Sequence, residues 1–436
     1  MCGICKKTVQ VTQALFKAFR EMEESYMSDF QQKLQKYAEL AVRVGANVHP
    51  GQTLIVHAPI LSAELVRLIV KSAYTAGAKL VTVKWSDETI TRLQYELAPD
   101  ETFNIAPKWY AAEMTEEVEN GAAVLHVIAE NPDLLQGIPS SRITAAQRVR
   151  SHELRQYREY QMADKFSWSL IAYPSAEWAA KVFPDLPASE QMDKLWDAIF
   201  STVRVDLDNP VEAWKEHLKI LSSKADILNA KRYKKLHYLA PGTDLTIELA
   251  KDHLWVAAES VNQQGHTFVA NMPTEEVFTA PLKTGVNGKV SSTKPLSYSG
   301  NIIDNFSLTF ENGRIVDVQA ETGLETLQHL VEMDEGSHYL GEVALVPHKS
   351  PISDKNILFY NTLFDENASN HLAIGNAYAF NLKGGKDMTQ EQLAANGLNS
   401  SLTHVDFMIG SGEMDINGVT EDGTEEPIFR KGNWAI

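Results

Sequence analysis

Short apolar runs alternate with helical patterns along the first half of the chain. Residues 53–59 (TLIVHAP) and 79–85 (KLVTVKW) have the length of strands, and residues 62–76 between them show helical spacing that Gly77 ends. Two more apolar runs follow at residues 122–130 and 167–174. A strand, helix, strand succession is typical of parallel βαβ units, so we predict an α/β domain with a mostly parallel sheet. Further helices are expected after a cap at Ser28 or Asp29 and over residues 107–118, 145–163, 189–203 and 211–224.

The pattern changes to a strand-rich one after about residue 236. Residues 236–249 predict a hairpin around Pro241-Gly242, and residues 305–320 predict another around Asn312-Gly313, a strong hairpin turn signal. A helix is expected over residues 322–333. We therefore predict an α/β protein with three parts: an extension (1–26), an N-terminal α/β domain with a mostly parallel sheet (27–230) and a C-terminal α+β metal-binding domain (231–436).

The extension is predicted because the capped, periodic helix begins only after Met27. Residues 1–26 lack the continuous apolar core of a secretory signal, and an N-terminal amphipathic helix is the alternative. The only cysteines are Cys2 and Cys5, so the rest of the chain can form no disulfide, which is typical of a cytoplasmic protein. A lone C-x-x-C is at most half of a zinc site.

Composition and charge narrow the range of partners. The chain has 436 residues, 44% of them hydrophobic, and a formal net charge of −17. This acidic balance argues against nucleic acid, whose phosphates need clustered lysine and arginine. No stretch approaches the roughly 18 apolar residues of a membrane span, so we expect no membrane partner. No glycine-rich phosphate loop follows a predicted strand, so a bound nucleotide is not indicated.

Acids and histidines recur within apolar stretches of the second half. The loop after residue 358, LFYNTLFDENASNHLAIGNAY, leads an acidic, amide-rich segment onto His371. Glu342 begins an apolar strand, and His404 and Asp406 lie two apart on another, so their side chains share one face. The polar groups of this loop are costly to bury without partners.

Each of these segments also has a simpler interpretation. The loop could be a polar surface turn, and Glu275 and Glu276 could be acids in the first turn of a helix. Glu342 could pair with an arginine, and His404 could be a core imidazole bonded to a carbonyl. Together, however, two glutamates, two histidines and an aspartate from four segments form the oxygen and nitrogen set that zinc, manganese or cobalt prefers.

Five motifs follow one another in chain order: NMPTEEVFTAP, LGEVALVP, SPIS, LFDENASNHLAIGNAY and SLTHVDFMIGS. They closely resemble those of the aminopeptidase T and aminopeptidase S family of dinuclear metallopeptidases. The similarity runs from about Met27 to the C-terminus and includes WSLIAYPSAEWAAKVFP in the first half. The resemblance implies peptide substrates, a homodimer and two divalent metal ions, zinc, cobalt or manganese. Carried over by motif, the metal ligands are Glu276, Glu342, His371, Tyr378, His404 and Asp406.

Within this set the roles are only partly assigned. Glu342 is the expected bridging carboxylate, since it enters from its own strand between the other ligands. Tyr378 could ligate a metal or donate to an oxyanion, and the general base is unassigned, with Glu275 and Glu366 as candidates. The expected activity is that of a metal-dependent aminopeptidase. The alternatives are a dinuclear metal amidase with a non-peptide amide or ester substrate and a catalytically silent binding protein.

Overall fold

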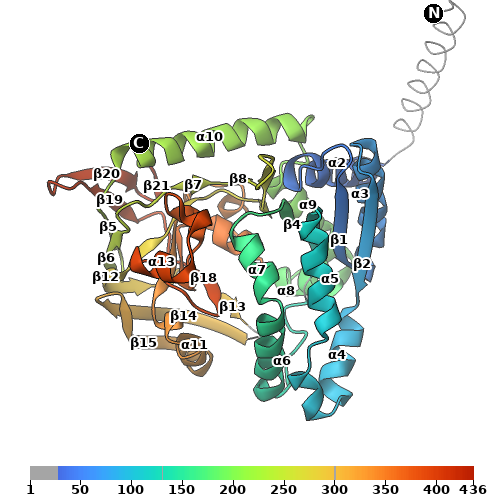
Figure 1. The fold of residues 1–436 in the computed structure, drawn as a ribbon, viewed down its shortest axis with the longest axis horizontal. Helices are drawn as coiled ribbons and strands as arrows, with labels where there is room; N and C mark the ends of the chain where they lie inside the picture. Colours follow the sequence, from blue (N-terminus) through green and yellow to red (C-terminus); the bar gives the residue numbers. More distant parts are fainter. Residues whose placement is uncertain (1–27, 130, 299–300) are drawn as a thin grey trace, which may run out of the picture.

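A computed structural model describes residues 28–129, 131–298 and 301–436, and the predicted extension 1–26 lies outside them. The first half forms a parallel sheet in the order β10-β4-β3-β1-β2 with helices packed on it (Figure 1). Its four sequential strands fall in the four predicted apolar runs, so the prediction of an α/β fold is confirmed. They are β1 (Thr53–Pro59), β2 (Leu80–Ser86), β3 (Ala123–Ile128) and β4 (Trp168–Ala172).

The helices of this half follow the sequence pattern, with three differences. The predicted helix over 145–163 is two helices, α6 (Ser140–Glu153) and α7 (Arg155–Met162), separated at the buried Leu154. The helices α4 (Glu88–Leu97) and α8 (Ala176–Val182) were not predicted. The remaining helices are α2 (Asp29–Leu40), α3 (Ala63–Thr75), α5 (Lys108–Glu119), α9 (Ala188–Thr202) and α10 (Pro210–Lys231).

The second half is built from antiparallel sheets. Both predicted hairpins are confirmed: β5 (Lys235–Ala240) pairs with β6 (Thr243–Leu249), and β14 (Asn301–Glu311) pairs with β15 (Arg314–Thr322). They belong to a nine-stranded sheet, and the predicted helix is α11 (Leu324–Val331). A five-stranded sheet has the order β18-β17-β16-β11-β7, with strands β18 (His404–Met408), β17 (His371–Gly375), β16 (Leu340–Leu345), β11 (Val277–Thr279) and β7 (Val256–Ala257).

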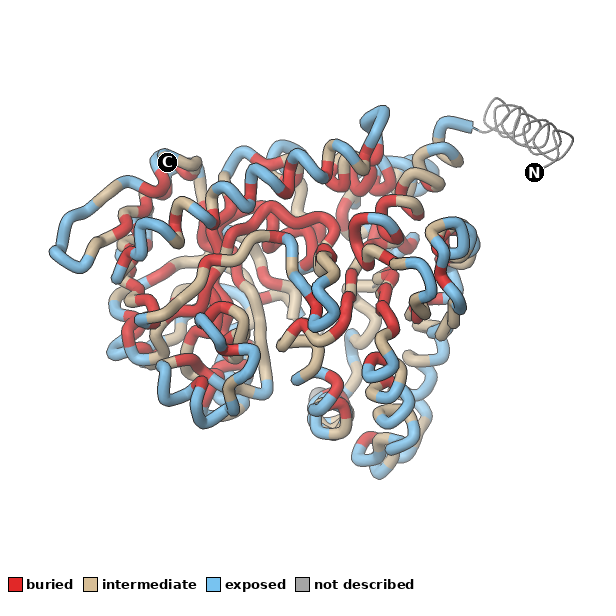
Figure 2. The backbone as a smooth tube through the Cα atoms, turned by 45° about the horizontal axis from the view of Figure 1, so that its top comes forward, coloured by how far each residue is buried: buried red, intermediate tan, exposed pale blue. Residues whose placement is uncertain are grey.

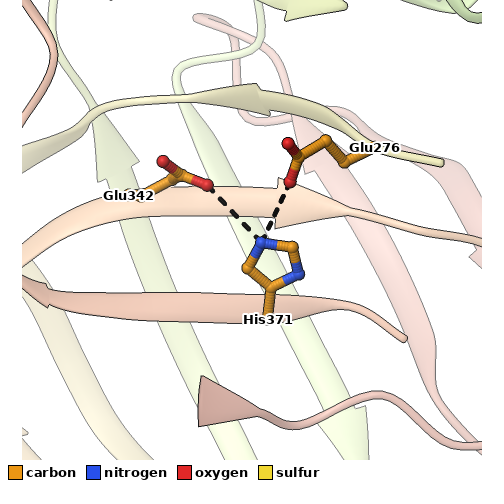
Figure 3. Close-up of side chains that lie close together, drawn as sticks. All are labelled: Glu276, Glu342 and His371. Carbon is orange, nitrogen blue, oxygen red and sulfur yellow. Dashed lines mark ion pairs between the residues drawn. The ribbon is translucent and has the colours of Figure 1, made fainter. Parts of the chain in front are cut away.

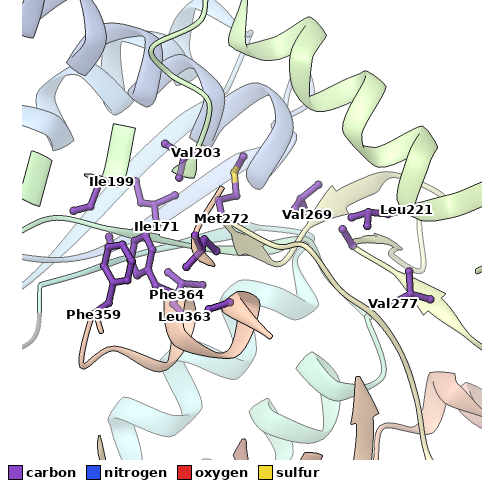
Figure 4. Packing of buried hydrophobic residues seen from close by; sticks show 14 of the residues in the cluster. Ile171, Ile199, Val203, Leu221, Val269, Met272, Val277, Phe359, Leu363 and Phe364 are labelled. Atoms are coloured by element: carbon purple, nitrogen blue, oxygen red, sulfur yellow. The ribbon is translucent and has the colours of Figure 1, made fainter. Parts of the chain in front are cut away.

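The two halves of the chain are joined by shared packing. The short strand β10 (Asn271–Met272) comes from the second half but pairs in parallel with β4 of the first. Buried residues of both halves form one hydrophobic cluster, in which Ile171 of β4 lies near Met272 and Phe364 (Figures 2 and 4). The long helix α10 runs along both halves (Figure 1). Helix α10 ends at Lys231, but β10 returns to the first sheet, so the division at residue 231 stays a prediction.

No helix within the described part of the chain is long and apolar enough to cross a bilayer.

Candidate metal centre

Four neighbouring strands bring the candidate ligands together. In the registers of β16, β17 and β18, Glu342 lies opposite Ala373, which in turn lies opposite Asp406. His371 and His404 lie at the start of β17 and β18, and Glu276 immediately precedes β11. The antiparallel pairing therefore gathers side chains from residues 276 to 406 on one face of this sheet.

The ligand atoms form two groups that share one carboxylate. In the first, His371 Nε2 lies 3.1 Å from Glu276 Oε2 and 3.5 Å from Glu342 Oε1 (Figure 3). In the second, His404 Nε2 lies 3.6 Å from Glu342 Oε2 and 3.5 Å from Asp406 Oδ1. Within each group the potential ligand atoms lie within 4.8 Å of one another. Glu342 thus directs one oxygen toward each histidine, the arrangement expected of a bridging carboxylate.

Each of the two histidine rings is oriented by a backbone carbonyl group that lies beside its Nδ1 atom, on the side away from the cluster. His371 Nδ1 lies 3.2 Å from the Ser369 carbonyl oxygen, and His404 Nδ1 lies 2.7 Å from that of Asn376. A ring that donates through Nδ1 presents its Nε2 lone pair to the centre, as histidine ligands commonly do. The carbonyl bond that we considered as an alternative for His404 is therefore compatible with a ligand role.

The acids and histidines of the cluster are buried close together, and this shifts their pKa values. Burial, together with the nearby acids Asp406 and Glu276, raises the pKa of Glu342 to about 7. Burial also raises the pKa of Glu366 well above its ordinary value. Burial alone would lower the pKa of His404, but the carboxylates of Asp406 and Glu342 outweigh it and raise that pKa to about 9. Without a cation, protons bound by these carboxyl groups and histidines offset the repulsion between the buried carboxylates.

The residues fit a pair of divalent cations. The donors are carboxylate oxygens and imidazole nitrogens without a thiolate, a set suited to zinc, manganese or cobalt. Asp406 Oδ1 is buried and has no hydrogen-bond partner among the described residues. A cation would supply the missing partner for this oxygen.

Tyr378 and Glu366 line the same cavity as these ligands. The Tyr378 ring centroid lies 4.9 Å from that of His404. Burial and the surrounding carboxylates raise the pKa of the Tyr378 phenol well above its ordinary value, which keeps the proton on the hydroxyl. Glu366 Oε1 accepts from Asn367 Nδ2 at 3.3 Å and from Asn271 Nδ2 at 3.4 Å. All six candidate ligands therefore lie around one cavity, with Glu366 beside them.

The structure corrects one expectation about Glu275 and Glu276 and bears on another. These residues do not begin a helix, because an extended segment leads from them into β11. Of the two candidate bases, Glu275 is the less suited: it is buried against Arg204 Nη2 at 2.7 Å and His217 Nε2 at 3.5 Å, and it is not among the described residues that line the cavity. Neighbouring residues on an extended chain point in opposite directions, so Glu276 faces the ligands and Glu275 faces away.

The interpretation of residues 365–370 as a polar surface turn is also wrong, because these residues are buried. Asp365 is 3% exposed and accepts from the backbone N–H groups of Phe359 and Asn361. Asn367 accepts from the backbone N–H of Glu275, and Asn370 accepts from that of Val346. The amide-rich loop therefore supports the site, because its side chains accept hydrogen bonds from backbone N–H groups of neighbouring segments.

Sequence reasoning missed the part of the cavity that the first half of the chain supplies. Asp164 and Trp168 line it together with the candidate ligands. Trp168 begins the WSLIAYP motif, which was the available signal, but nothing in the sequence placed this strand beside the metal ligands.

Comparison with known proteins shows the family to which this chain belongs. A family model described as thermophilic metalloprotease (M29) matches residues 30–434. The chain belongs to the M29 family of thermophilic metalloproteases. The relatives include aminopeptidase AmpS of Bacillus subtilis, 59% identical over 94% of this chain and 100% of that protein, and aminopeptidase T of Thermus aquaticus, 42% identical over 94% and 100%. The structure of wild-type AmpT from Thermus thermophilus superposes with a TM-score of 0.88, at 41% identity over 93% of this chain and all of that one.

Membership of the M29 family agrees with the donor chemistry. The matched region contains both ligand groups and the cavity around them. An M29 metalloprotease needs a divalent cation, and the described residues offer a site for one in each group.

Proposed function

We propose that this chain is a metal-dependent aminopeptidase that removes single residues from the free amino end of peptides. The observation that carries the proposal is Glu342, which lies between His371 and His404 and joins two ligand groups into one centre. The names of the relatives, aminopeptidase AmpS and aminopeptidase T, support the choice of substrate.

Two divalent ions would be held by this centre, one by Glu276, Glu342 and His371 and the other by Glu342, His404 and Asp406. When bound, they supply Lewis acidity toward a water molecule and the scissile carbonyl group. Tyr378 lines the same cavity and would complete the coordination or donate a hydrogen bond from its hydroxyl group to the developing oxyanion.

Proton transfer is assigned to Glu366. It lines the cavity, lies outside both ligand groups and is held by two side-chain amides. A carboxylate whose pKa is raised by burial is suited to accept a proton from water and return it to the leaving amine. The amide donors keep its oxygen atoms oriented during this transfer.

The substrate ammonium group finds an acidic environment in this cavity. Glu276, Glu342 and Asp406 would offset the charge of the bound cations, and Glu366 is a further carboxylate outside both ligand groups, so a cationic amine is accommodated at the start of the peptide. An amine held at a fixed distance from the centre places the first peptide bond in position for attack and disfavours cleavage further along.

The test of this proposal compares a short peptide with its N-acetylated form. We expect stepwise loss of single residues from the free peptide and no cleavage of the acetylated one, followed by mass spectrometry. Efficient internal cleavage of the acetylated peptide would move the assignment to an endopeptidase or a general amidase. Absence of any turnover of peptides, amides and esters by metal-loaded protein would favour the silent binding protein.

Metal binding is expected to release protons. At pH 6 the metal-free protein holds protons on Glu342, whose pKa is raised to about 7, on His404, whose pKa is raised to about 9, and on His371, whose pKa the neighbouring carboxylates raise well above its ordinary value. Since metals take these three groups deprotonated, their affinity should rise with pH through this range, and about three protons should leave when both groups of ligands fill at pH 6. Titration calorimetry with zinc in buffers of different ionisation enthalpy measures this release. Binding without net proton release would exclude these ligands.

A homodimer and a cytoplasmic location complete the proposal. The family resemblance supports the homodimer, and the absence of cysteine after Cys5 supports the location. Zinc, cobalt or manganese would serve as the metal, since each suits imidazole and carboxylate ligands.

A further inference from the structure

Three aromatic side chains form one wall of the cavity that contains the candidate ligands. They are Trp168, Phe278 and Phe380, called here the aromatic wall. All three are partly exposed. Their exposed apolar surface faces a cavity, so it is available to a bound molecule.

The aromatic wall adjoins the metal ligands directly. Phe278 follows Glu276 by two residues on an extended segment, so both side chains leave the same face. The Phe380 ring stacks on that of Tyr378 with centroids 5.0 Å apart and packs edge-on against Phe278 at 5.9 Å. The wall therefore begins about one side chain away from the ligands, and ring contacts hold Phe278 and Phe380 in place, while Trp168 packs against Phe268.

Small apolar side chains and a carboxylate that is already paired lie near the wall. Ala257, Ala258 and Ala270, whose side chains are small, also line the cavity. Besides the candidate ligands and Glu366, Asp164 is the described carboxylate that lines the cavity. It is 3% exposed and accepts a hydrogen bond from Lys386 Nζ at 2.8 Å. A charged substrate side chain would find no free partner of opposite charge in this part of the cavity.

We propose that the aromatic wall is the specificity pocket for the first residue of the peptide and selects a large apolar side chain there. This inference rests on the proposed aminopeptidase function. The amine and the side chain of the first residue share one Cα, so an amine bound beside the acids directs that side chain, rather than a later one, onto the adjoining wall. Apolar contact with the rings then raises kcat/KM for such substrates.

The test uses amino-acyl amides, which contain only the first residue, and measures the ratio of kcat/KM for phenylalanyl amide to that for alanyl amide. Two variants change the cavity in opposite ways: Trp168→Ala removes a ring, and Ala270→Leu enlarges a small side chain that lines it. We expect both to lower the ratio about tenfold, with turnover of alanyl amide largely kept. Trp85→Ala is the control, since Trp85 is 48% exposed on β2 and does not line the cavity.

The possible outcomes distinguish failure of the specificity pocket from failure of the proposed aminopeptidase function. A parallel loss of both substrates, with an unchanged ratio, would show that Trp168 and Ala270 act only on the fold and would overturn the specificity pocket. The variants could instead change the preference for the second residue of alanyl dipeptides and leave the ratio for the two amides unchanged. That result would assign the wall to the residue that leaves after cleavage. Failure of the wild-type enzyme to hydrolyse either amide would overturn the aminopeptidase function itself.

Discussion

Replacement of Glu342 by glutamine is expected to lower turnover of an amino-acyl amide on the order of a thousandfold, because several kcal/mol of transition-state stabilisation depend on both ions. Glu342 belongs to both ligand groups, with one oxygen toward His371 and the other toward His404. A neutral amide keeps the size of the side chain but cannot bridge two cations. The metal content of the purified variant should fall with its activity.

The matched control for this variant is Asp365→Asn. Asp365 is also a buried carboxylate in this half of the chain, but it accepts from backbone N–H groups and does not line the cavity. It should lose stability without losing metal. If Glu342→Gln bound two ions and stayed fully active, the shared-carboxylate centre would be excluded, and circular dichroism of both variants separates this result from misfolding.

Removal of the metals is the second change with a large expected effect. Chelation should abolish turnover and lower the melting temperature, because Glu276, Glu342, Glu366 and Asp406 are then left together without cations. Ligand binding to the folded state adds about 2.7 kcal/mol of stability at a free concentration 100 times Kd, so each ion lost removes a stabilisation of that order. Manganese, cobalt or zinc should restore both properties.

Activity assays and thermal denaturation are compared on the same chelated sample, with metal content measured by mass spectrometry. Magnesium serves as the control ion, since it prefers an octahedral oxygen shell that retains several waters. Full turnover by protein shown to be free of metal would contradict the account. Restored stability without restored activity would place the binding site elsewhere.

Hydrophobic periodicity predicted most of the fold because most elements carry their own pattern. The runs that became β1 to β4 are apolar along their length, and Asn312-Gly313 specifies its hairpin locally. Helix α8 has only seven residues, which is too few for a periodic pattern to stand out. The pairing of β10 with β4 joins residues about one hundred positions apart and has no local signal.

The ligand types were readable from sequence, but their grouping was not. Alternation placed His404 and Asp406 on one face of a strand, and the structure has them there. The family motif predicts Glu276 as a ligand, but the position of Glu275 depends on Arg204 and His217, which come from other segments and pair with it. The aromatic wall likewise combines Trp168 with two residues more than one hundred positions away.

The central claim is that two cations share Glu342, and anomalous diffraction from crystals of the manganese- or zinc-loaded protein tests it most directly. We predict two anomalous peaks roughly 3.5–4 Å apart, one beside Glu276 and His371 and the other beside His404 and Asp406, with Glu342 between them. A single peak, or peaks that do not contact Glu342, would contradict the account.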